Sequence, residues 1–230
     1  AADLLLDVCQ FGRDFGAEGG LIQRMIGMAL LLPAWNELKD LAGSGELSAD
    51  DLREVGRGLE VLDGAFPRFA EVLSDEAMSM GLTLKQEKGW DPWGVVYASG
   101  IETMLDVYSR AGAASDRSWA DERAVTERLE KEMQDYLNPI TKMAIPSLAS
   151  IGKAVREGRV RLRLVRAAVH YKATGEAREF DDPFGTKLGS DEKGGKRRFW
   201  SVGPDGVDDG GNGAWQTPPA PKDIVIEVER

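Results

Sequence analysis

The chain has 230 residues, a formal net charge of −10 at pH 7 and a sequence pI of about 4.8. This acidic balance argues against nucleic acid as a partner, because binding to phosphates requires a concentrated basic face. The single cysteine, Cys9, excludes an internal disulfide and a zinc site built from cysteines, and it is compatible with an exported as well as a cytosolic protein.

The first 175 residues carry the periodicity of helices. Apolar residues in the opening segment recur at spacings of three and four, which predicts an amphipathic helix: Leu4, Leu5, Val8, Phe11 and Phe15. Residues 21–42 are apolar on most sides and predict a central helix. Their longest apolar run, residues 26–35, is interrupted by Pro33 and has only about half of the roughly 20 residues that a membrane span requires. We therefore expect no membrane span in this chain.

Ser48 predicts the start of the next helix. It is a good N-cap residue, and Asp50 and Asp51 suit the first turn that follows it. An apolar stripe then runs through residues 52–62, and a further helix is expected from about residue 65, with Pro67 near its first turn.

Residues 88–100 interrupt the helical pattern. Asp91-Pro92-Trp93-Gly94 has the composition of a β-turn, with Asp first, Pro second and Gly fourth. Trp90, Trp93 and Tyr97 cluster around it and are candidates to line a groove for a small ligand, the alternative being packing in the core. Helices are then expected over residues 101–112, 115–137 and 140–175.

After Gly175 the composition shifts to Gly, Pro and Asp. Residues 197–202 and 223–229 have the pattern of strands, which predicts two or three antiparallel strands packed against the last helix. The short basic run of Lys193, Lys196, Arg197 and Arg198 is interpreted as a solvated hairpin. The expected fold is mostly α, a multi-helix bundle with a small C-terminal antiparallel β lobe (α+β). We expect a helical body over residues 1–154 and a C-terminal module over residues 155–230.

The stretch FWSVGPDGVDDGGNG, residues 199–213, is the clearest candidate for a site. Asp205, Asp208 and Asp209 lie within five residues, and like charges this close repel unless a cation lies among them. The many glycines let backbone carbonyls turn inward, and carboxylate and carbonyl oxygens suit Ca²⁺. The spacing does not follow the EF-hand pattern. The alternative is a solvated, metal-free hairpin loop.

The order of motifs near the C-terminus resembles the major pseudopilin of type II secretion. It comprises Asp182-Pro183-Phe184-Gly185, the stretch FWSVGPDG, Gly210-Gly211 and Asp223-Ile224. The resemblance covers residues 155–230; the family's N-terminal membrane helix has no match in the chain, and about 150 helical residues stand in its place. It implies a loop that binds Ca²⁺ through acidic side chains and carbonyls. Asp205 matches the family's loop aspartate and Asp223 the closing one, whereas Asp208 and Asp209 fall in the variable part.

No catalytic residue stands out. His170 is the only histidine, and the chain has no HExxH, GxSxG or GxxxxGK[ST] motif. We therefore expect a non-enzymatic bacterial cell-envelope protein with a structural calcium site, acting through contact with a protein partner. Its expected location is extracytoplasmic, in the periplasm or at the cell surface, with anchoring by a further segment left open. The alternatives are a small-ligand binder or hydrolase with a site in the helical body, and a component of a secretion or pilus machine.

Overall fold

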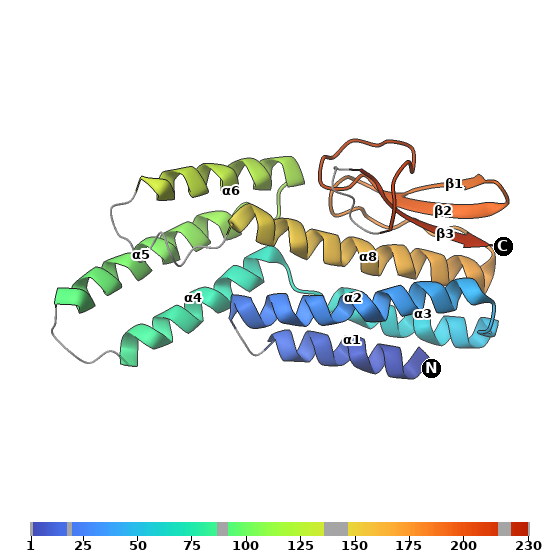
Figure 1. Ribbon diagram of the computed structural model, residues 1–230, viewed down its shortest axis with the longest axis horizontal. Coiled ribbons are helices and arrows are strands. Elements are labelled where there is room, and N and C mark those ends of the chain that lie inside the picture. The colour runs from blue at the N-terminus through green and yellow to red at the C-terminus, as the bar shows by residue number, and fades with distance from the viewer. Residues whose placement is uncertain (1, 18–19, 87–91, 136–146, 216–221, 230) are drawn as a thin grey trace. The chain divides into compact units, whose positions relative to one another are not determined.

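The computed structural model describes residues 2–17, 20–86, 92–135, 147–215 and 222–229. Within them the chain forms seven helices: α1 (Ala2–Ala17), α2 (Leu21–Ser44), α3 (Ala49–Gly64), α4 (Phe69–Gln86), α5 (Pro92–Gly112), α6 (Trp119–Gln134) and α8 (Leu148–Thr174). Three strands follow: β1 (Gly189–Lys193), β2 (Lys196–Ser201) and β3 (Ile224–Glu229). This confirms the expected mostly-α fold with a small antiparallel sheet (Figure 1).

The described helices were compared with the length and hydropathy that a membrane span requires. In the described part of the chain, none is both long enough and apolar enough to cross a bilayer, which agrees with the expectation from the interrupted apolar run.

The chain divides into two compact units by its internal contacts. Unit 1 comprises Ala1–Phe15, Ile26–Phe66 and Arg156–Arg230, and unit 2 comprises Gly16–Met25 and Pro67–Val155. The boundary expected between residues 154 and 155 falls within α8, beside the point where that helix passes from one unit to the other. The C-terminal module and most of the first three helices thus share one unit by contacts, and the separate helical body stays a prediction.

In unit 1, α3 begins where the sequence predicts. The Ser48 hydroxyl accepts the Asp51 backbone N–H, and the Asp51 carboxylate accepts the Ser48 N–H, so two free donors of the first turn are satisfied. The stripe predicted for this helix is buried: Leu52, Val55, Leu59 and Leu62. On α1, a Cβ added at Gly12 would lie 3.0 Å from the carbonyl oxygen of Gly27 on α2, so the two backbones approach closely at this glycine.

In unit 2, helix α5 begins earlier than expected. Pro92 is its first residue, where the missing N–H costs nothing, so Pro92 to Gly94 form the first helical turn instead of the predicted β-turn. Ser118 caps α6 by accepting the Asp121 N–H. The buried face of α6 contains Trp119, Leu129 and Met133.

The sheet has the order β1-β2-β3, and both pairs are antiparallel. Lys193 opposes Lys196 across the hairpin, and Phe199 on β2 opposes Ile226 on β3. The Phe199 ring packs edge-on to Tyr171 of α8, with 6.1 Å between ring centroids. The strands therefore cover the C-terminal part of α8 (Figure 1), as a sheet this small requires.

Candidate functional site in the C-terminal lobe

We call residues 176–229 the β lobe. Near its start lies a turn built on Asp182, which is only 4% exposed. The carboxylate accepts the Phe184 N–H at 3.0 Å, the Ser201 hydroxyl at 2.7 Å and the Val202 N–H at 2.9 Å. Burial raises the pKa of Asp182, and these hydrogen bonds act in the opposite direction. Asp182 therefore joins the turn of residues 182–185 to the end of β2.

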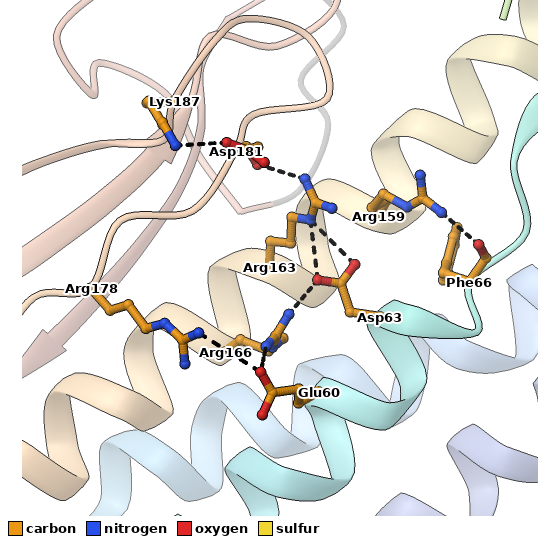
Figure 2. Close-up of polar contacts among 9 residues, drawn as sticks. All are labelled: Glu60, Asp63, Phe66, Arg159, Arg163, Arg166, Arg178, Asp181 and Lys187. Atoms are coloured by element: carbon orange, nitrogen blue, oxygen red, sulfur yellow. Dashed lines mark hydrogen bonds and ion pairs between the residues drawn. The ribbon is translucent and has the colours of Figure 1, made fainter. Parts of the chain in front are cut away.

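A network of charged side chains connects α3, α8 and the start of the β lobe (Figure 2). The Asp63 carboxylate at the end of α3 pairs with Arg163 and Arg166 of α8, and Arg166 also reaches Glu60 at 3.2 Å. Arg163 donates in addition to the carbonyl of Asp181 at 2.9 Å. The hydrogen bond from Arg163 to Asp181 holds the start of the β lobe against α8. The carboxylates of Glu60 and Asp63 both take part in ion pairs with arginines of α8.

The acidic loop, residues 203–213, opens with a tight turn. The Gly206 N–H donates to the Gly203 carbonyl at 3.1 Å, and the Asp205 carboxylate accepts the Val207 N–H at 3.1 Å. Asp208 accepts the Gly210 N–H at 2.9 Å. Two of the four predicted calcium ligands thus stabilise turns of the loop itself.

Asp223, immediately before β3, lies beneath this loop. It is fully buried and accepts the Gly211 N–H at 2.8 Å and the Asp209 N–H at 3.4 Å. Burial raises the pKa of Asp223, the two N–H donors lower it, and the nearby negative charges of Asp208 and Asp209 raise it further. The fold therefore brings the backbone of the acidic loop onto the carboxylate of Asp223, which is distant in sequence.

Arg198 on β2 holds the same loop from its other side. Its guanidinium donates to the carbonyls of Gly211 at 3.0 Å and Gly210 at 3.2 Å, and it forms a forked ion pair with Asp191. It also lies over the Trp200 ring, 5.6 Å from the centroid. The interpretation of the basic run as solvated is wrong for Arg198, which is 7% exposed. The hairpin itself is present.

Trp200 completes the set of contacts that close the loop. Its indole N–H donates to the Asp208 carboxylate at 2.9 Å. Sequence reasoning identified neither Trp200 nor Arg198 as a site residue. One sequence feature could have indicated them. Arg198 and Trp200 are two residues apart in a predicted strand, so they share one face of it, and the strand directly precedes the acidic loop. Polar atoms on that face are therefore within reach of the loop.

The described residues do not present a ready calcium site. Calcium takes six to eight oxygen ligands, and within the described ranges no three acidic, histidine or cysteine side chains are grouped so that they could hold a metal ion. The carboxylates of Asp208 and Asp223 accept protein donors, and two loop carbonyls face Arg198. Oδ1 of Asp208 accepts two of these donors, from Trp200 and Gly210, whereas each oxygen of Asp223 accepts one and keeps a lone pair. Calcium binding would therefore require the aspartates to turn toward a common point. Their role as calcium ligands stays a prediction.

The second predicted site falls mostly outside the described part of the molecule. Trp90 lies outside the described residues, and the side chains of Trp93 and Tyr97 do too, although their backbone belongs to α5. A ligand groove at this cluster stays a prediction. His170 lies on α8, where burial and the charge of Arg178 lower its pKa.

Comparison of the chain with models of known protein families, with curated proteins and with solved structures gives no match.

Proposed function

We propose that this protein is a non-enzymatic component of the bacterial cell envelope that faces an extracytoplasmic space and acts through contact with another protein. The observation that carries the proposal is the construction of the C-terminal module. A long helix leads through the turn of Asp182 into three antiparallel strands, and the acidic loop between β2 and β3 folds back onto Asp223. The helix, the turn of residues 182–185, the Gly-rich loop and Asp223 follow one another in the order of the motifs on which the resemblance to the major pseudopilin rests.

The proposal includes a structural calcium ion in the acidic loop. Asp208 and Asp209 come near Asp223 although about 14 residues separate them in the chain, and a dication would offset the repulsion among these carboxylates. Asp205 would contribute a fourth carboxylate from the preceding turn. The ion would neutralise charge and rigidify the loop. Calcium outside cells is abundant enough to fill a weak site of this kind.

Thermal unfolding of the whole chain tests the calcium part of the proposal. The chelated protein is melted alone, with millimolar Ca²⁺ and with millimolar Mg²⁺, and the series is repeated with Asp205→Ala. A site of the proposed kind raises the melting temperature with Ca²⁺ only, and the substitution removes that rise. Equal curves in all three conditions would remove calcium from the proposal.

The location is tested separately. We expect the protein, expressed from its natural gene in its own cells, to be accessible to a protease added outside the cytoplasmic membrane, with a cytosolic protein as the control. Protection equal to that of the cytosolic control would contradict the envelope assignment.

A further inference from the structure

Helix α1 exposes a continuous apolar row. Four side chains on one side of the helix, at spacings of four, three and four residues, face solvent: Leu4, Val8, Phe11 and Phe15, with exposed fractions of 67%, 37%, 61% and 38%. The two phenyl rings lie 6.1 Å apart, centroid to centroid. The row spans about three helical turns, or roughly 17 Å along the axis.

This row is distinct from the face that α1 uses inside its own unit. Cys9 and Gly12 face inward, and Gly12 lies against Gly27 and Leu31 of α2. The helix therefore has an apolar sector wider than the contact with α2 can cover. Contiguous exposed apolar surface of this kind, at the spacing by which helices engage one another, is typical of a docking surface.

An acidic row runs beside the apolar one. Asp3, Asp7 and Asp14 directly precede Leu4, Val8 and Phe15, and all three are exposed. Asp14 pairs with Arg13 at 2.6 Å. Within the described residues, Asp3 and Asp7 make no ion pair, so their charges are available to a partner.

We propose that the apolar row of α1 docks an amphipathic helix of another protein, with leucine-like side chains seated on the row and Lys or Arg residues along the acidic row. This rests on the proposed function and names the chemistry of its partner. Charge complementarity selects this occupant over a second copy of the chain. Two copies pairing antiparallel would bring their acidic rows together, and each carries a net charge of −10.

The test measures binding of a synthetic helical peptide to the whole chain by fluorescence anisotropy. The probe contains Leu at spacings of four, three and four and Lys at the neighbouring positions, and the control probe has Glu in place of every Lys. We expect the Leu/Lys peptide to bind and the Leu/Glu peptide to bind at least tenfold more weakly. No binding by the Leu/Lys peptide, or equal binding by both, overturns the proposal.

Protein variants show whether binding uses the row itself. Phe11→Ser removes an exposed ring and is expected to weaken binding by about tenfold or more. Burial of a phenylalanine side chain in an interface changes the dissociation constant by at least that factor. Val61→Ser is the matched control, because Val61 is equally exposed, at 65%, on α3. Equal loss in both variants overturns the proposal, as does a native dimer in light scattering that Phe11→Ser dissociates. The calcium melts are independent of this outcome, so the two proposals fail separately.

Discussion

The guanidinium of Arg166 on α8 donates to the carboxylate of Asp63, the penultimate residue of α3. Arg163 approaches both oxygens of the same carboxylate at 3.2 Å, so one aspartate pairs with two arginines (Figure 2). The side chain of Asp63 is 8% exposed. Removal of its charge would leave two guanidinium groups with less compensation in a poorly solvated place, and that loss costs more than the pairing itself contributes.

Asp63→Asn is therefore expected to lower the free energy of unfolding by about 3 kcal/mol, the scale for breaking a buried pair. Asp50→Asn is the matched control on the same helix: Asp50 pairs with Arg53, but its side chain is 90% exposed, and the expected change is within about 0.5 kcal/mol. Urea unfolding followed by circular dichroism measures both. A loss in Asp63→Asn no larger than in the control would show that the network in Figure 2 adds little stability.

Arg198→Gln tests whether the acidic loop is held by protein groups. The substitution removes the ion pair with Asp191 and the donors to the carbonyls of Gly210 and Gly211. In the presence of a chelator, we expect the free energy of unfolding to fall by about 2 kcal/mol, the scale for hydrogen bonds made by a charged group.

Hydrogen exchange at the Gly211 amide localises the effect of Arg198→Gln, because this N–H donates to the buried Asp223 carboxylate. Exchange should be faster in Arg198→Gln and unchanged in Arg53→Gln, which removes an exposed arginine of α3. Unchanged protection in Arg198→Gln would mean that the loop does not depend on this side chain.

The helices and two of the strands could be predicted because their signals are local. The Ser48 cap and the stripe of α3 are encoded within 16 residues, and the alternation of β3 buries Ile224 and Ile226 while it exposes Glu227. β1 carries no such signal. Its sequence GSDEK is polar, and it becomes a strand because Gly194 and Gly195 adopt positive φ and fold it against β2.

The position of the candidate site could be predicted from the sequence, but the side-chain contacts that hold it could not. The gathering of aspartates near Gly-rich turns predicts a loop in which charge must be compensated, and Asp223 was connected to that loop only through the resemblance. The contribution of Arg198 depends on the register of β2 against β1, which places it opposite Asp191. Register follows from pairing between strands, and no local pattern in residues 197–202 specifies it.

The pKa of Asp223 gives a prediction about pH. Because burial and the neighbouring aspartates raise it in the folded state, the folded protein holds this proton more tightly than the unfolded chain does. The contribution of Asp223 to stability is then largest below the ordinary aspartate pKa and is lost as pH rises through the raised value. A ¹³C-carboxyl titration should give a midpoint above the ordinary value of about 3.9. A midpoint at or below that value would contradict the prediction.

Cys9 should be unreactive in the folded protein. Its side chain is fully buried on the inward face of α1, and burial raises the pKa of its thiol to about 12, so little reactive thiolate forms at neutral pH. We expect slow reaction with a disulfide reagent in buffer and rapid reaction in denaturant. The double variant Cys9→Ser, Val8→Cys moves the thiol to the exposed row and should react rapidly without denaturant. Equal rates for the two folded proteins would contradict the inward placement of Cys9.

Gly203 and Gly206 form a matched pair within the turn that opens the acidic loop. Both have positive φ, +68° and +72°, so an added Cβ strains the backbone equally, by about 1 kcal/mol. At Gly206 the Cβ would meet nothing within 4 Å, whereas at Gly203 it would lie 2.5 Å from the carbonyl oxygen of Lys222. Gly203→Ala should therefore destabilise the protein clearly more than Gly206→Ala in urea unfolding, because the backbone beside Asp223 must shift to admit the methyl group. Equal losses would mean that the acidic loop and the segment before β3 are not in close contact, and the packing of the loop on Asp223 would lose its structural basis.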